Sequence, residues 1–161
     1  MEIIRLSEIN YEQAAQKAAL VLRKGGLVLF PTDTLYGIAA DATNPKALAL
    51  LRTLKGREKK KPISIIVPDI ASIETYAIFN DTTRSLAERF LPGALTLVMQ
   101  ATNRIPEELL LNGAIGIRIP NDPFCLALAR AFGKPYTATS ANKSGRETPG
   151  TIRDVLMQFG Y

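Results

Sequence analysis

The sequence contains no histidine and no tryptophan, and its single cysteine is Cys125. Histidine is the commonest general base and a frequent metal ligand, so its absence excludes Ser-His-Asp triads and zinc sites built on imidazole. One cysteine can form neither an internal disulfide nor a cysteine zinc cluster. Because Cys125 lies in the apolar stretch FCLALARAF, we expect a buried core residue rather than a nucleophile. Chemistry must therefore depend on carboxylates, hydroxyls, Lys, Arg and backbone amides, or on a metal carried by a ligand.

The sequence also lacks long hydrophobic runs. None approaches the roughly 20 apolar residues that a membrane-spanning helix needs, and the start, MEIIRLSEIN, does not have the charged and then apolar plan of a signal peptide. We therefore expect a cytoplasmic protein that does not contact membranes. The chain has 161 residues, of which 47% are hydrophobic, and this predicts one domain over residues 1–161 with a packed core.

Positive charge is concentrated in one short segment. The net charge is +5, and residues 52–61 contain six basic residues and one acidic residue, so this segment carries the whole excess. Such a distribution favours a local anion site over a generally basic surface. The stretch KGREKKKP at residues 55–62 has no aromatic residue and no GxxxxGK[ST] motif, so it predicts neither base stacking nor a P-loop. A solvated loop remains the alternative.

Helix and strand patterns alternate along the chain. Apolar residues recur at helical spacing over residues 8–24, and Asn44-Pro45 begins another helix with a capping residue and a first-turn proline. The other predicted helices cover residues 82–90, 121–133 and 151–159, and the predicted strands cover residues 27–30, 63–67, 95–99, 115–120 and 136–142. This alternation predicts a layered α/β fold.

Two polar segments follow predicted strands. In PTDTLYGIAADA, residues 31–42, the side chains of Thr32, Asp33 and Thr34 come directly after a buried strand, and a turn needs only one of them. In TATSANKSG, residues 137–145, hydroxyl and amide side chains alternate with small residues. This second segment is either an anion-binding loop near a helix N-terminus or an ordinary polar loop.

An arginine lies within the predicted strand IGIRIP, residues 115–120. Because side chains alternate along a strand, Gly116 and Arg118 share one face. Arg118 would project over a surface that the glycine leaves open. Its partner is either a carboxylate or phosphate ligand or an acidic residue of the protein itself, and the spacing does not choose between them.

Five stretches together resemble the YrdC domain family of threonylcarbamoyl-AMP synthases. They are PTDTLYGIAADA, KGREKKKP, PGALTLVM, IGIRIP with Asn121-Asp122-Pro123 after it, and TSANKSG, and they extend in order from residue 31 to residue 145. The resemblance implies a YrdC-like α/β fold, in which a twisted mixed sheet and flanking helices surround a positively charged concave cavity.

The resemblance implies a nucleotidyltransferase that makes threonylcarbamoyl-AMP and pyrophosphate from L-threonine, bicarbonate and ATP. The threonine amine takes up carbon dioxide or bicarbonate, and an oxygen of the N-carboxylate then attacks the α-phosphorus of ATP. Mg²⁺ would be carried by ATP, and the protein would supply no metal ligands. The product would pass to a separate transferase that modifies the adenosine next to the anticodon of certain tRNAs.

The resemblance also assigns residues. Those assigned to ATP phosphates and catalysis are Lys55, Arg57 and Lys61, and those assigned to the nucleotide side are Ser140, Asn142 and Thr148. Those assigned to threonine are Thr34, Arg118 and the backbone around Ala138. Thr32 is then expected to form the turn, and Asp33 is left between backbone capping and the active site. Ile66 aligns with a histidine that contacts threonine in some members, so a contact there would be apolar or through the backbone.

Family domains usually continue beyond the length of this chain, with a further strand that helps to close over the substrates. We therefore expect a more open nucleotide site and weaker activity than in a longer relative. Two other functions stay open. One is an RNA-binding module in which residues 52–61 contact the backbone of tRNA, ribosomal RNA or double-stranded RNA. The other is a carbamoyl-transfer domain, against which the absence of accessory domains counts.

Overall fold

The fold is built around one mixed β-sheet. The structure, a computed structural model, describes residues 2–6, 10–58 and 61–161. In these residues the sheet has six strands in the order β1-β2-β6-β3-β5-β4. Their bounds are Val28–Phe30 (β1), Gly37–Ala39 (β2), Ser64–Ile66 (β3), Leu97–Gln100 (β4), Ala114–Arg118 (β5) and Tyr136–Ser140 (β6). Strands β3 and β5 pair in parallel and the other neighbouring pairs are antiparallel, so β6, the last strand in the sequence, lies in the middle of the sheet.

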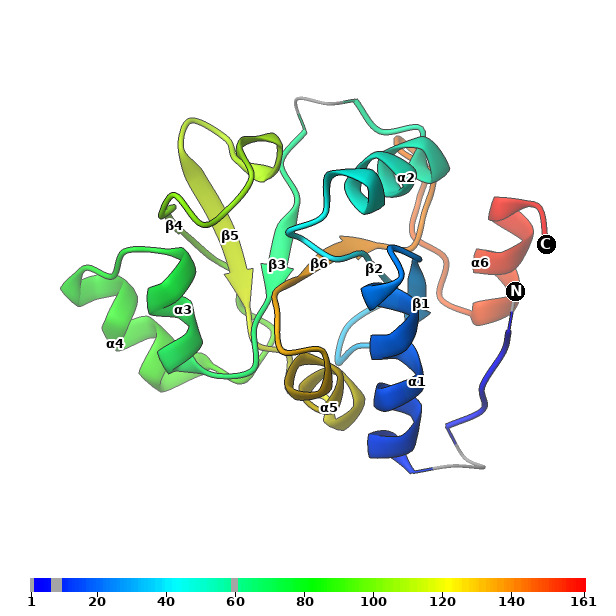
Figure 1. The fold of residues 1–161 in the computed structure, drawn as a ribbon, viewed down its shortest axis with the longest axis horizontal. Helices are drawn as coiled ribbons and strands as arrows, with labels where there is room; N and C mark the ends of the chain where they lie inside the picture. Colours follow the sequence, from blue (N-terminus) through cyan, green and yellow to red (C-terminus); the bar gives the residue numbers. More distant parts are fainter. Residues whose placement is uncertain (1, 7–9, 59–60) are drawn as a thin grey trace.

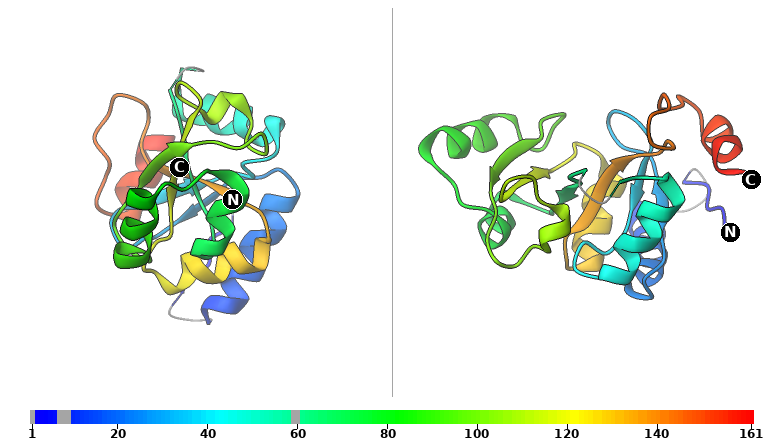
Figure 2. Two further views of the ribbon diagram at one scale, coloured as in Figure 1. Left: turned by 90° about the vertical axis from the view of Figure 1, so that its left-hand side faces the viewer. Right: turned by 90° about the horizontal axis from the view of Figure 1, so that it is seen from above.

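Helices flank this sheet (Figure 1). Their bounds are Tyr11–Arg23 (α1), Pro45–Lys55 (α2), Ile70–Tyr76 (α3), Asp81–Phe90 (α4), Pro123–Phe132 (α5) and Ile152–Phe159 (α6), with a 3-10 turn at Glu107–Leu109. Local chemistry sets the ends of α2. Asn44 accepts hydrogen bonds from the first-turn amides, and Gly56 ends the helix with a left-handed φ of 59°. Figure 2 shows α3 and α4 at one end of the molecule and α6 at the other.

Two hydrophobic clusters lie on opposite faces of the sheet. Because side chains alternate along a strand, Ile117 of β5 packs with Leu48 and Leu51 of α2, while Ile66 of β3 points the other way. Ile66 joins a second cluster with residues of α1 and α5, two helices that pack side by side beneath β1, β2 and β6. Arg118 pairs with Ile66, so it lies on the face that α1 and α5 cover, and it is half-buried there.

The layered α/β fold predicted from the sequence is confirmed, with strand and helix ends shifted by a few residues. Helix α1 begins after Asn10, whose side chain caps it, while residues 8 and 9 of the predicted segment lie outside the described residues. The structure adds two elements that the patterns did not predict, β2 and α3. Cys125 is fully buried in the second cluster, as expected. Within the described residues, no helix is both long and apolar enough to cross a bilayer.

Candidate functional site

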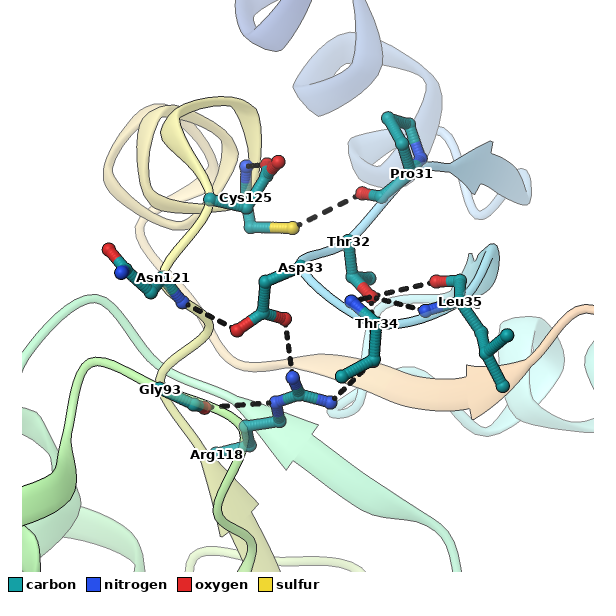
Figure 3. A network of polar contacts seen from close by, with 10 residues as sticks. Pro31, Thr32, Asp33, Thr34, Leu35, Gly93, Arg118, Asn121 and Cys125 are labelled. Atoms are coloured by element: carbon teal, nitrogen blue, oxygen red, sulfur yellow. Dashed lines mark hydrogen bonds and ion pairs between the residues drawn. The ribbon is translucent and has the colours of Figure 1, made fainter. Parts of the chain in front are cut away.

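The segment after β1 forms a turn around Thr32. The hydroxyl of Thr32 accepts hydrogen bonds from the backbone amides of Thr34 (3.1 Å) and Leu35 (3.2 Å) and donates one to the Leu35 carbonyl (2.7 Å). These three bonds confirm Thr32 as the turn-forming residue. The hydroxyl of Thr34 also lies 3.1 Å from that of Thr32, and the side chains of Asp33 and Thr34 face the end of β5 (Figure 3).

Arg118, at the end of β5, is the centre of a polar network that Figure 3 shows. Its Nη2 donates to Asp33 Oδ1, its Nη1 donates to Thr34 Oγ1 at 3.1 Å, and its Nε donates to the Gly93 carbonyl at 3.3 Å. The other oxygen of Asp33 accepts the backbone amide of Asn121 at 3.0 Å. Asp33 therefore belongs to the candidate site rather than to a turn, and it joins the turn after β1 to the β5–α5 connection.

The partner of Arg118 in the protein is thus an acidic residue, one of the two alternatives that the sequence left open. The other alternative, a carboxylate or phosphate ligand on Arg118, is compatible with the geometry as well. A guanidinium carries five N–H groups. Three of them make the bonds described, so one N–H on each Nη remains for a ligand. Arg118 and Asp33 have side chains 16% and 14% exposed, so the pair is mostly shielded but still reachable.

The expectation that Gly116 leaves an open surface next to Arg118 is wrong. A Cβ at Gly116 would lie 2.4 Å from Ser64 Oγ and 3.2 Å from Thr96 Cγ2. The space is therefore filled by the side chains of Ser64, in β3, and of Thr96, which directly precedes β4. Ser64 in turn pairs with Ala138 of β6, so Ala138 lies on the same face of the sheet, half-buried. This places the predicted threonine-contacting backbone of β6 on the face that carries Arg118.

Lys55 ties the end of α2 to the loop after β6. Its ammonium donates to the Ser140 carbonyl and lies 3.5 Å from Asn142 Oδ1, and its own carbonyl accepts the Ser144 amide at 2.7 Å. Lys55 is 1% exposed. Burial, and then the positive charge of Arg57, lowers the pKa of Lys55 to about 8. The sequence placed Lys55 in a phosphate-binding loop; the structure shows a buried side chain at a helix end.

The loop after β6 is shaped by its own amide and hydroxyl groups. Ser140 Oγ donates to Asn142 Oδ1 at 2.5 Å, and Asn142 Nδ2 donates to the carbonyls of Lys143 (3.0 Å) and Arg146 (2.6 Å). The Ala141 amide donates to the Tyr36 carbonyl at 2.8 Å. The loop therefore connects with the segment that carries Thr34, and the predicted Ser140 and Asn142 lie together with Lys55. Thr148 is half-buried further along the same loop.

The basic segment 52–61 is not one exposed patch. Arg52 is 6% exposed, and its guanidinium donates to the carbonyls of Glu58 (2.8 Å), Lys61 (3.2 Å) and Glu108 (2.5 Å). It therefore holds the loop after α2 in place and cannot contact RNA. Lys61 is exposed and lies 3.6 Å from the Glu58 carboxylate. Lys59 and Lys60 lie outside the described residues.

Arg57 lies near Arg52, the residue that holds the loop after α2. Its Nη2 donates to the Pro62 carbonyl at 2.8 Å. Burial, and then the charge of Arg52, lowers the pKa of Arg57. Among the described residues, the Nε atoms of Arg52 and Arg57 are buried without a hydrogen-bond partner. Arg57, Lys55 and Arg52 thus bring three positive groups to the end of α2, an arrangement that an anion would stabilise.

Two features lie apart from these contacts. Ile66 is 1% exposed and packs in the second cluster, so its side chain serves the core. A shallow hollow between α3 and α5 is lined by Tyr76, Arg130 and Lys134 among others, and none of the predicted site residues lines it. The contacts around Arg118 and Lys55, rather than this hollow, define the candidate site. Among the described residues, no three His, Cys, Asp or Glu side chains are grouped as metal ligands would be.

Comparisons with known proteins agree with this fold. Residues 20–161 match the Sua5/YciO/YrdC family, which is described as Telomere recombination. A protein of Methanocaldococcus jannaschii is 40% identical over 99% of this chain and 79% of its own length. The threonylcarbamoyl-AMP synthases of Mus musculus and Bacillus subtilis are 36% and 38% identical over 90% and 91% of this chain. The chain spans only 52% and 43% of the lengths of these two relatives.

Solved structures of other proteins have the same fold as this chain. P. abyssi Sua5, in a crystal structure complexed with L-threonine, superposes with a TM-score of 0.86 at 31% identity, over 99% of this chain and 46% of that one. E. coli YciO superposes with a TM-score of 0.82 at 24% identity over 91% of this chain and 72% of that one, and at this identity the likeness shows the fold alone. A mixed sheet with flanking helices is therefore the shared architecture.

Proposed function

The chain belongs to the Sua5/YciO/YrdC family, and from this membership we propose that it is a threonylcarbamoyl-AMP synthase. Its substrates would be L-threonine, bicarbonate or carbon dioxide, and ATP, and its products would be threonylcarbamoyl-AMP and pyrophosphate. The observation that carries the proposal is the position of Arg118, which keeps two N–H groups for a carboxylate beside the hydroxyl of Thr34. The relatives named as synthases and the relative complexed with L-threonine support the same reading.

Threonine would bind at the Arg118 network. An arginine with two free N–H groups can take a carboxylate by paired hydrogen bonds. Thr34 Oγ1 lies 3.1 Å from Arg118 Nη1, so a ligand held by the guanidinium is within reach of this hydroxyl. The backbone at Ala138 lies on the same face of the sheet and would limit the other side of the ligand. The site would therefore fix the amino acid by its carboxylate.

The ATP phosphates would bind at the end of α2. The positive charge of Arg57 contributes to the lowered pKa of Lys55, and a phosphate beside the two groups would relieve this repulsion. Lys61 is exposed on the same loop and would contact the outer phosphates. Ser140, Asn142 and Thr148 would contact the nucleotide. Mg²⁺ would arrive on ATP, where it neutralises part of the phosphate charge.

The chemistry follows from these placements. The threonine nitrogen adds to carbon dioxide and loses a proton, which gives an N-carboxylate. One oxygen of this group attacks the α-phosphorus, and the bond from the α-phosphorus to the bridging oxygen breaks as pyrophosphate leaves. Charge builds on phosphate oxygens in this step, so pre-placed Lys55 and Arg57 would stabilise the transition state. The enzyme would thus be a nucleotidyltransferase, and a separate tRNA threonylcarbamoyl transferase would consume its product.

Pyrophosphate release tests the proposal. Protein, ATP, Mg²⁺ and bicarbonate should release pyrophosphate only when L-threonine is added, and Arg57→Ala should lower the rate by about a hundredfold or more because one pre-placed cation is lost. Arg89→Ala removes an arginine in the last turn of α4 that makes none of the contacts described for the site, and it should keep the rate. If pyrophosphate release does not depend on threonine, and the protein binds RNA in a salt-sensitive way, the result would support the RNA-binding function over the synthase.

A further inference from the structure

The charge of Arg118 is already compensated by the protein. The ion pair with Asp33 joins two side chains that are each less than a fifth exposed, so solvent screens it only in part. Arg118 is 16% exposed and Asp33 is 14% exposed. A ligand that reaches the two remaining N–H groups of Arg118 therefore meets a neutral pair rather than an isolated positive charge.

A neutral pair discriminates between kinds of carboxylate. A ligand with a single negative charge is attracted by Arg118 and repelled by Asp33, so little net attraction remains. A zwitterion carries a positive nitrogen one carbon away from its carboxylate. With its carboxylate on Arg118, that nitrogen would be within reach of Asp33, the partner of Arg118, and both charges of the ligand would then face opposite charges.

Asp33 has the capacity for this contact. Its Oδ1 accepts from Arg118 Nη2 and its Oδ2 accepts from the Asn121 amide. Each oxygen of a carboxylate can accept about two hydrogen bonds, so each oxygen of Asp33 keeps one acceptor position. The Asn121 amide also fixes the orientation of the carboxylate, so the remaining positions do not rotate away from the site.

We propose that Asp33 is a specificity-determining residue, and that the Asp33–Arg118 pair makes the site select a zwitterionic amino acid over a hydroxy acid with the same carboxylate. This inference rests on the proposed function, because it assigns the nitrogen of the proposed threonine substrate to Asp33. It differs from a purely positioning role, in which Asp33 only orients Arg118. A positioning role would favour every carboxylate equally.

Calorimetric titration with two ligands separates these roles. L-threonine has both charges, and (R)-3-hydroxybutanoate has the same carboxylate and hydroxyl but no nitrogen. Wild-type protein should bind threonine more tightly by about tenfold or more. In Asp33→Asn the affinity for threonine should fall by about tenfold, while the affinity for the hydroxy acid should change by less than about twofold or should rise. The preference for the zwitterion would then be lost.

Asp69→Asn is the matched control. Asp69 caps α3 and accepts the Ser72 amide at 2.7 Å, but it faces no arginine in the described residues, and asparagine also caps helices. This variant should keep both affinities. If Asp33→Asn does not fold, as judged by circular dichroism, Asp33→Ala is titrated in its place and should lose the same preference.

The outcomes separate the inference from the proposed function. Equal losses of affinity for both ligands in the Asp33 variant would overturn the inference and leave the synthase intact. Equal affinity of the wild type for both ligands would overturn it as well. If the wild type binds no threonine at all, the proposed function fails and the inference fails with it.

Discussion

Lys55, the last residue of α2, donates a hydrogen bond from its buried ammonium to the carbonyl of Ser140, the last residue of β6. This contact couples the basic end of a helix to the loop that follows the central strand. Because the ammonium is buried, its charge depends on what lies beside it, and that dependence can be measured.

Binding of ATP should weaken as the pH rises through about 8. In the free protein burial and Arg57 lower the pKa of Lys55 to about 8. A phosphate beside the ammonium favours its protonated form and raises this pKa, so binding takes up a proton. The affinity should therefore be highest below pH 8 and should fall by at most about tenfold per pH unit above it. Titration calorimetry between pH 7.5 and pH 9.5 measures the affinity for ATP. Repeating it in buffers that differ in ionisation enthalpy measures the number of protons taken up on binding.

The pH effect should disappear when the lysine is replaced. Lys55→Met removes the titrating group and should leave a weak affinity with no dependence on pH above 7.5. Lys46→Met, in the first turn of the same helix, removes an exposed lysine and should keep the pH dependence. An unchanged pH profile in Lys55→Met would show that another group titrates.

Arg52→Met should destabilise the fold. The methionine keeps the buried volume but leaves the carbonyls of Glu58, Lys61 and Glu108 without their donor. All three of these residues are exposed, so water replaces part of the loss, and we expect the free energy of unfolding to fall by roughly 1–3 kcal/mol. Urea denaturation measures this change. Arg84→Met removes an exposed ion pair with Glu74 and should leave the denaturation midpoint unchanged.

Gly116→Ala should destabilise the fold, and a second substitution, Ser64→Ala, should relieve part of this destabilisation. The new methyl group would lie 2.4 Å from Ser64 Oγ and 3.2 Å from Thr96 Cγ2. Crowding of this kind costs roughly 1–3 kcal/mol. Removing the hydroxyl of Ser64 opens the closest contact, so the double variant should be more stable than the sum of the single effects predicts. Strictly additive effects in a urea double-mutant cycle would contradict the packing described for β3 and β5.

Cys125 should not react with thiol reagents in the folded protein. It is fully buried, and burial, assisted by the nearby Asp122 carboxylate, raises its pKa far above the ordinary value for a thiol. The thiolate, which is the reactive form, is therefore scarce at neutral pH. Mass spectrometry after iodoacetamide treatment should show one alkylation in denaturant and none without it. Rapid alkylation of the folded protein would rule out the buried position.

Most of the fold could be predicted from periodicity and capping, because these signals lie within the residues of each element. Helix α2 is an example that has both. Asn44 begins the helix as the sequence predicts, and Gly56 ends it. Strand β2 was missed because all three of its residues are buried, which removes the alternation that identifies a strand. Helix α3 has seven residues and therefore shows too few turns for a periodic pattern.

The site was predicted less well than the fold. The spacing of Leu48, Arg52 and Lys55 places both cations on the buried face of α2, whereas the run of charges by itself predicts a solvated loop. The pairing of Asp33 with Arg118 had no local signal, since 85 residues separate the two side chains. Sequence patterns report neighbours along one element, whereas this pair forms only when two distant segments meet.

The strand order has a consequence for synthesis on the ribosome. Strand β6 lies between β2 and β3, and it is the last strand of the sheet to leave the ribosome. Until Tyr136–Ser140 has emerged, the hairpin of β1 and β2 and the group of β3, β4 and β5 are two separate pieces, each with an unpaired edge. Such edges invite pairing with other chains, so a nascent chain stalled before β6 should be a substrate for chaperones that shield open strands.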